Sequence, residues 1–316
     1  MVDGLSEAVV QTQAPGLAAE AGTRRARLVT AGVALALAIA VYTPILRGLV
    51  GNWIENEDYS HGFLIVPLSL YFIWERRDKL ASLPVEPSWW GLPLLLLSSV
   101  TLFIGRLGVE YMNMRISFVL MISGLALMLL GRRIYRVLAF PLLFLFLMVP
   151  LPQSIVNTIA FPLQLIAASL AVDVLHLVRV PALLEGNIIH LANGPLFVAE
   201  ACSGLRSLMA LITLGVVFAY FFRRNLVERL IIVASTIPIA ILVNSFRVAL
   251  TGVLAYYFGQ EAAGGVVHET QGLFTFGIAF LLLLFEAWLL SQIWPRLFGS
   301  REEVARCSRP WSHFSS

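Results

Sequence analysis

Residues Leu230–Leu250 read LIIVASTIPIAILVNSFRVAL, an apolar run with Asn244 and Arg247 near one end. An α-helix needs roughly 20 mostly apolar residues to cross the hydrocarbon core of a bilayer, and this run meets that length. Similar runs recur from one end of the chain to the other, and the 316 residues are 59% hydrophobic and only 13% charged. This composition lies far outside the soluble range, so the sequence predicts an all-α polytopic membrane protein embedded in a lipid bilayer.

The apolar runs predict about eight transmembrane helices. We expect them over Leu28–Leu46, His61–Trp74, Gly91–Gly105, Ile116–Leu130, Val137–Val149, Ser203–Phe222, Leu230–Leu250 and Gln271–Trp294. His61–Trp74 and Val137–Val149 are short, and they would need flanking residues or a locally thin bilayer to cross.

Basic residues predict the orientation, because Lys and Arg are retained on the cytoplasmic side. Most of the 22 Lys and Arg residues fall into five clusters, which are Arg24/Arg25/Arg27, Arg76/Arg77/Lys79, Arg132/Arg133/Arg136, Arg223/Arg224/Arg229 and Arg296/Arg301/Arg306/Arg309. With these clusters inside, both termini are cytoplasmic. We expect a disordered tail over residues 1–23, a transmembrane domain over 24–298 and a cytoplasmic tail over 299–316. No cleavable signal peptide is evident before Arg24.

Ser154–Val178 is a further apolar segment that tests this count. A single crossing would move Arg223, Arg224 and Arg229 to the outer side, against the charge rule. We therefore expect a re-entrant hairpin or an interfacial helix on the outer side, with Pro162 as a possible break. Two short crossings also satisfy the parity.

The segment that follows has the pattern of a small β-hairpin. Asn187–Ala192 and Leu196–Ala199 flank Asn193-Gly194, a dipeptide typical of hairpin turns. Pro195 weakens the prediction slightly, because proline cannot donate to a ladder. We expect this hairpin on the outer face, leading directly into Cys202.

Three polar residues then fall at the same predicted membrane face on consecutive spans: Cys202, Arg247 and His268. A thiol becomes nucleophilic as a thiolate, which a helix N-terminus or a nearby cation favours. Cys202 is placed at a helix start, with Arg206 one turn later on the same face. His268 could exchange protons with the thiol or a leaving amine, and Arg247 could stabilise an oxyanion or hold a carboxylate. The pattern is that of a nucleophilic site.

Each of these residues also has a simpler interpretation. A lone membrane Cys is usually a small packing residue, an Arg at a span end usually extends to the headgroups, and a lone His is usually interfacial. Arg247 weighs against this, because it lies within reach of the bilayer, where an ionisable group is costly and suggests a function. Catalysis and packing both remain open on spacing alone.

Asp58 and His61 open the second predicted span on the same outer face, and Glu200 precedes Cys202, so these residues are candidates to support the site. The acidic residues near Asp58 lack the compact spacing of a metal site, and no nucleotide-binding motif is visible. We expect no metal, no cofactor and no nucleic-acid partner. Cys307 is predicted in the cytoplasm, so we expect no disulfide with Cys202.

From about Asp58 to Trp294 the chain resembles the exosortases, of the exosortase/archaeosortase family of membrane-embedded cysteine transpeptidases. The resemblance rests on Asp58-Tyr59-Ser60-His61-Gly62, Glu200-Ala201-Cys202-Ser203-Gly204-Leu205-Arg206-Ser207, Asn244-Ser245-Phe246-Arg247-Val248, and His268 with Gly272 and Phe276. It implies that Cys202, Arg247 and His268 are catalytic. Arg206, Glu200, Ser203, Asn244, Asp58 and His61 would support them or bind substrate. No extra C-terminal domain follows the last span, so the exosortase subtype is open.

The resemblance also implies a substrate class and a location. The substrates would be exported proteins with a C-terminal Pro-Glu-Pro-type motif, a hydrophobic helix and a basic tail. Cys202 would attack a peptide carbonyl at the periplasmic face of a bacterial inner membrane, as part of protein sorting associated with exopolysaccharide. The acyl group would pass to an undetermined acceptor or to water.

Two other classes of function stay open. In a transporter, Arg247, His268 and Glu286 would serve a solute or ion pathway, and Cys202 would be dispensable. In a non-enzymatic component of a surface-polysaccharide or protein export system, Cys202, Arg247 and His268 would only shape a binding groove.

Overall fold

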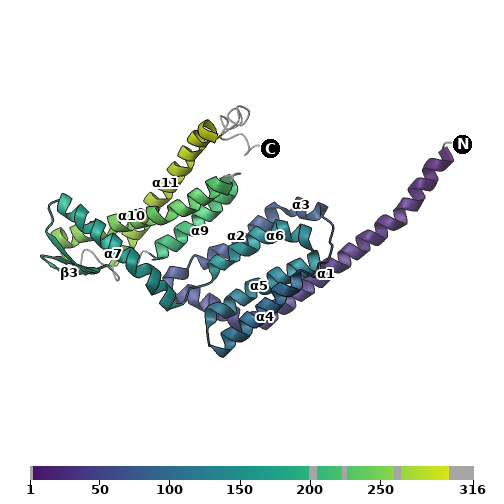
Figure 1. Ribbon diagram of the computed structural model, residues 1–316, viewed down its shortest axis with the longest axis horizontal. Coiled ribbons are helices and arrows are strands. Elements are labelled where there is room, and N and C mark those ends of the chain that lie inside the picture. Colours follow the sequence, from purple (N-terminus) through teal and green to yellow (C-terminus); the bar gives the residue numbers. More distant parts are fainter. Residues whose placement is uncertain (1–2, 199–204, 223–225, 260–264, 299–316) are drawn as a thin grey trace. The chain divides into compact units, whose positions relative to one another are not determined.

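The computed structural model describes residues 3–198, 205–222, 226–259 and 265–298, which divide into two compact units, Met1–Pro152 and Gln153–Ser316. Both units are mainly helical, as the composition predicts (Figure 1). Within the described residues, five helices are long and apolar enough to cross a membrane. These spans are Arg24–Glu55, Tyr111–Leu130, Gln153–Leu177, Leu226–Phe258 and Thr270–Ile293, and the shorter apolar helices are Gly62–Glu75, Gly91–Leu107 and Ser207–Phe221.

The first unit contains six α-helices and two short 3-10 helices among its described residues. They are α1 (Asp3–Glu55), η1 (Glu57–Tyr59), α2 (Gly62–Glu75), α3 (Arg77–Ser82), α4 (Gly91–Leu107), α5 (Tyr111–Leu130), α6 (Arg132–Phe144) and η2 (Leu145–Met148). Helix α1 includes most of the segment for which we expect disorder, since its Ala, Glu and Gln residues favour helix. The predicted span Val137–Val149 differs from the structure, because α6 begins earlier and gives way to η2 after Phe144.

Helices α4 and α5 form a closely packed antiparallel pair (Figure 1). The carboxylate of Glu110 begins α5 by accepting hydrogen bonds from the backbone N–H groups of Met112 and Asn113, at 3.3 and 2.8 Å. Gly131 ends α5 with a φ of 89°, which favours glycine. Its Cα also lies against the carbonyl of Glu86, which leaves no space for a side chain.

The second unit contains four α-helices and one small sheet among its described residues. They are α7 (Gln153–Leu177), β1 (Ala182–Glu185), β2 (Ile188–Leu191), β3 (Gly194–Phe197), α9 (Leu205–Phe222), α10 (Leu226–Phe258) and α11 (Gly265–Phe298). Helix α7 is continuous through Pro162, so the expected re-entrant hairpin and the pair of short crossings are wrong. It is long enough for one crossing, and the interfacial helix stays a prediction.

A Schellman motif ends α7 and turns the chain into the sheet. Arg179 has a φ of 64°, its N–H donates to the His176 carbonyl, and the Val180 N–H donates to the Leu175 carbonyl. Val180 and Leu175 are both buried, which supplies the hydrophobic contact of this motif. The sequence offered no glycine here to mark the end of the helix.

The sheet is antiparallel, in the order β1-β2-β3. The predicted hairpin is present as β2 and β3, but its turn is Ala192-Asn193, and Gly194 already belongs to β3. Sequence reasoning missed β1, which joins β2 through Gly186-Asn187, where Gly186 has a φ of 62°. Leu191, Leu196 and Val198 from the sheet side pack into one core with α7 and α10.

Candidate functional site

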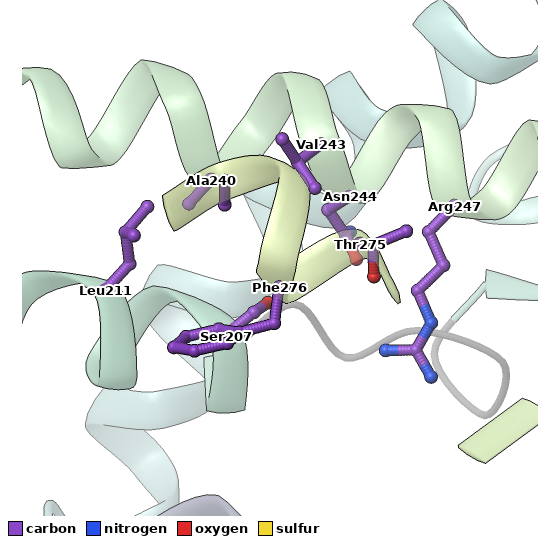
Figure 2. Close-up of a pocket in the computed structure, with 9 residues that line it drawn as sticks. Ser207, Leu211, Ala240, Val243, Asn244, Arg247, Thr275 and Phe276 are labelled. Atoms are coloured by element: carbon purple, nitrogen blue, oxygen red, sulfur yellow. The ribbon is translucent and has the colours of Figure 1, made fainter. Parts of the chain in front are cut away.

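A cavity of about 10 Å³ lies between α9, α10 and α11, within the second unit. Figure 2 shows Asn244 and Arg247 reaching from α10, with Thr275 and Phe276 of α11 beside them. The lining residues are Ser207, Leu211, Ala240, Val243, Asn244, Arg247, Thr275, Phe276 and Ala279. The three predicted spans therefore meet in the structure, and each contributes at least one polar residue to the cavity.

Arg247 extends its guanidinium group across to α11, where it lies against Gly272. A Cβ atom added at Gly272 would be 3.4 Å from one terminal nitrogen of Arg247 and 3.6 Å from its Cζ atom. Gly272 follows His268 by four residues within α11, and residues four apart lie on the same face of a helix. The helix face that carries His268 is therefore the face that Arg247 approaches. The His268 side chain lies outside the described residues.

The Thr251 hydroxyl links the α10 turn that begins at Arg247 to α11. The Thr251 hydroxyl lies 2.9 Å from the Arg247 carbonyl oxygen and 2.9 Å from Oε1 of Gln271. Thr251 is buried, and Gln271 is only 6% exposed. Sequence reasoning missed Gln271, Thr251 and Thr275. The available signal was their spacing, because 271 and 275 fall on the helix face of His268, and 251 is one turn beyond Arg247.

Asn244 lies one helical turn before Arg247 and is only 8% exposed. Its Oδ1 atom is buried and accepts no hydrogen bond from the residues that the structure describes. A buried acceptor without a donor costs about 1–3 kcal/mol, so this position favours a bound donor. Asn244 is a sequence-predicted supporting residue, and the structure brings it into the cavity with Arg247.

The remaining predicted residues around the thiol are described in part or not at all. Glu200, Cys202 and Ser203 lie outside the described residues. Arg206 is the second residue of α9, and the structure gives its backbone only. In the sequence, Cys202 precedes Leu205, the first described residue of α9, by three positions.

Asp58 and His61 belong to the first unit, where η1 leads into α2. Burial raises the pKa of the Asp58 carboxyl, and the neighbouring His61 opposes this rise. Burial lowers the pKa of His61, against the opposing effects of the Leu147 and Asp58 carbonyls and the Asp58 charge. Burial therefore favours the neutral form of both the Asp58 carboxyl and the His61 imidazole.

No group of three or more His, Cys, Asp and Glu side chains converges in the described ranges. Glu286, the acidic residue of the last span, accepts a hydrogen bond from the Ser235 hydroxyl at 2.5 Å. This contact joins α10 to α11, and both residues are absent from the lining of the cavity that contains Arg247.

Comparison with known proteins gives one match. No curated protein and no solved structure matches the chain. The family model described as "Transmembrane exosortase (Exosortase_EpsH)" matches residues 53–285, which include Asp58, Cys202, Arg247 and His268. The match covers well over half of the chain and agrees with its apolar helices. The protein is therefore a multi-pass membrane protein that belongs to the transmembrane exosortase family.

Proposed function

We propose that this chain is a membrane cysteine protease or transpeptidase that removes a C-terminal sorting signal from exported proteins. The signal is of the PEP-CTERM type, with a Pro-Glu-Pro-type motif, a hydrophobic helix and a basic tail. The reaction takes place at the periplasmic face of the inner membrane. The catalytic residues are Cys202, Arg247 and His268.

The observation that carries this proposal is the approach of Arg247 to Gly272. A cation at bilayer depth is costly, and here its guanidinium lies on the helix face that carries His268. Helix α9, which follows Cys202 in the sequence, lines the same cavity through Ser207. A cation on α10 that faces the His268 side of α11, in a cavity that α9 also lines, supports the proposal, because acyl transfer by a thiol needs a base and an oxyanion donor close together.

In the proposed reaction, His268 takes the proton of the Cys202 thiol. The sulfur attacks the scissile carbonyl, the C–N bond breaks, and His268 returns the proton to the leaving amine of the membrane-anchored tail. Arg247 stabilises the oxyanion that forms between these steps. The resulting thioester then transfers its acyl group to an acceptor nucleophile or to water, which regenerates the thiol.

The remaining candidates have supporting roles in this proposal. Asn244 accepts a hydrogen bond from the substrate through its buried Oδ1 atom. Arg206, four positions after Cys202 in the sequence, favours the thiolate in this proposal, and Glu200 and Ser203 are sequence neighbours of Cys202. Asp58 and His61, in the first unit, stay candidates for substrate binding on the strength of their sequence motif.

The test is membrane co-expression with a reporter protein that carries a Pro-Glu-Pro-type C-terminal signal. We expect a gel shift from tail removal with the wild type and with Cys307→Ala, the matched control at the other cysteine. Cys202→Ala should abolish the shift, because the nucleophile is lost. A wild-type adduct with the reporter that hydroxylamine releases would identify the thioester.

Equal processing by Cys202→Ala and wild type would overturn the proposal. Absence of processing by the wild type across a range of such signals would do the same. Either result would leave Cys202 as a packing residue and would favour a transporter.

A further inference from the structure

The three-stranded sheet is anchored on the part of α10 that follows Arg247. The Asn193 side chain at the tip of the β2–β3 hairpin donates hydrogen bonds to the carbonyls of Ala255 and Tyr256, at 3.2 and 2.6 Å. These carbonyls belong to the C-terminal end of α10. Val198, directly after β3, shares a hydrophobic core with Val248, the residue that follows Arg247. The sheet is therefore held against the C-terminal part of α10, which begins directly after Arg247.

The register shows which backbone groups of β3 face away from the sheet. The Val198 N–H donates to the Asn187 carbonyl at 3.1 Å, and Leu196 and Gly194 pair with Ile189 and Leu191. Hydrogen-bonded pairs alternate along an antiparallel ladder, so Leu196 and Gly194 are the bonding positions of β3. Pro195 and Phe197 consequently direct their backbone groups to the outer edge. Pro195 has no N–H, but no hydrogen bond of the β2–β3 ladder uses this position, so the ladder is intact.

The two edges of the sheet differ. On β1, the His176 imidazole of α7 lies 2.8 Å from the carbonyl oxygen of Ala182 and covers that edge. On β3, none of the described residues pairs with the outer edge. Phe197 is the β3 residue that offers both an N–H and a carbonyl there, and its side chain is 44% exposed. Open strand edges readily accept another extended chain, and proteins usually cover them.

We infer that the outer edge of β3 binds an extended segment of the polypeptide substrate by strand addition, with Phe197 as the residue that exchanges backbone hydrogen bonds. This inference rests on the proposed function, because it assigns the segment next to the scissile bond to this edge. The edge needs one bonding residue opposite Phe197. On the bound segment, the residues before and after that bonding residue direct their backbone N–H groups away from β3. Proline is therefore tolerated at both positions. A Pro-Glu-Pro segment meets this requirement through its central residue.

In strand addition, main-chain hydrogen bonds provide affinity, and pockets for the side chains provide specificity. A single pair of backbone bonds suits an enzyme that processes many proteins and must release each product. The sheet also shares its core with Val248 and Ala249, the two residues that follow Arg247, so a segment on β3 lies close to the α10 turn that follows Arg247.

The test is the substitution Phe197→Pro, which removes the outward N–H and keeps an extended backbone. Phe197→Ala keeps that N–H and removes the aromatic side chain. Ala182→Pro is the matched control, because Ala182 is also a non-bonding position, on the opposite edge covered by His176. Each variant is made in the Cys202→Ala background. Binding of a dye-labelled peptide with a Pro-Glu-Pro motif and its hydrophobic helix is measured in detergent by fluorescence anisotropy.

We expect Phe197→Pro to weaken binding about three- to tenfold, as the loss of one backbone hydrogen bond does, with Ala182→Pro within twofold of the parent. Equal affinity for Phe197→Pro and the parent would overturn the inference. An equal loss with Phe197→Ala and with Phe197→Pro would also overturn it, because both variants lack the aromatic ring and only Phe197→Pro lacks the N–H, and it would assign the effect to the ring. Absence of any peptide binding would overturn it too.

Cleavage by the wild type separates this inference from the proposed function. If processing requires Cys202 but is unchanged by Phe197→Pro, the proposed protease activity stands and strand addition at β3 is wrong. If peptide binding depends on the Phe197 N–H but the wild type cleaves no reporter, strand addition at β3 stands and the proposed protease activity is wrong.

Discussion

Gly272 is the residue whose substitution most directly tests the position of Arg247. An alanine Cβ would lie 3.4 Å from a guanidinium nitrogen, in van der Waals contact with it, so the guanidinium could no longer move toward α11. Small misplacements of a catalytic group are costly, and we expect Gly272→Ala to slow tail removal roughly tenfold. The measurement is the initial rate of reporter processing in membranes.

Gly277 supplies the control for that experiment. It belongs to the same helix, and a Cβ added there meets nothing within 4 Å. Gly277→Ala should therefore process the reporter within twofold of the wild type while changing the helix propensity equally. A comparable loss in both variants would assign the effect to α11 itself rather than to Arg247.

His61 gives a pH prediction at the same scale. Burial lowers its pKa below the ordinary 6.5, while the charge of Asp58 raises it. Asp58→Asn removes that charge, so we expect the His61 pKa to fall further, and histidine ring NMR in micelles measures it. The folded state resists protonation, so this contribution to stability is complete above pH 6.5 and is lost as the pH falls through the lower, folded pKa. A rise of the His61 pKa in Asp58→Asn would contradict the assignment.

At the scale of elements, the α4–α5 pair depends on two glycines at its contact. A Cβ at Gly91 would lie 2.5 Å from the Met128 backbone nitrogen, which cannot move without shifting α5. A Cβ at Gly124 would meet the Leu95 side chain at 2.8 Å, and that side chain can rotate. We expect Gly91→Ala to destabilise the protein by about 1–3 kcal/mol, and Gly124→Ala by less.

Thermal unfolding in detergent measures this order of stabilities. Gly51→Ala in α1 is the control, because nothing lies within 4 Å of its added Cβ, and it should be neutral or slightly stabilising. A larger loss of stability for Gly124→Ala than for Gly91→Ala would contradict this prediction. It would show that the backbone near Met128 adjusts more easily than the Leu95 side chain.

The elements also show what hydropathy can and cannot predict. Long apolar runs such as Leu230–Leu250 and Gln271–Trp294 lie within observed helices, because periodic burial of apolar residues dominates there. The β2–β3 hairpin follows from its turn residues, whereas β1 has only four residues and no marked alternation of charge. Pro162 does not break α7, since a helix within apolar surroundings tolerates proline better than one in water.

Sequence patterns could predict those features of the candidate site that depend on a single helix. Arg247 and Asn244 stand out as polar residues inside an apolar run, and their cavity confirms that they lie together. The contact of Thr251 with Gln271 depends on how α10 and α11 are rotated against each other, which no single-helix pattern specifies. Gly272 appeared in the sequence as a motif residue, and only the packed helices show that it makes room for a guanidinium group.

At the scale of the whole molecule, the open question is the path of α7 relative to the bilayer. This helix is continuous and long enough to cross once, yet a single crossing would place Arg223, Arg224 and Arg229 outside. Single cysteines at Ser82, Gln153 and Ala192, all exposed, distinguish the two paths in a background of Cys202→Ala and Cys307→Ala. The probe is a membrane-impermeant maleimide applied to spheroplasts.

The charge rule predicts labelling at Gln153→Cys and Ala192→Cys in intact spheroplasts, and at Ser82→Cys only after permeabilisation. Both ends of α7 would then be periplasmic, so the helix lies in the interface and the sheet faces the compartment through which exported substrates arrive. Protection of Gln153→Cys alongside labelling of Ala192→Cys would instead show one crossing. The basic clusters on the two sides of α7 would then lie in different compartments, and the retention of Lys and Arg inside would no longer account for their distribution.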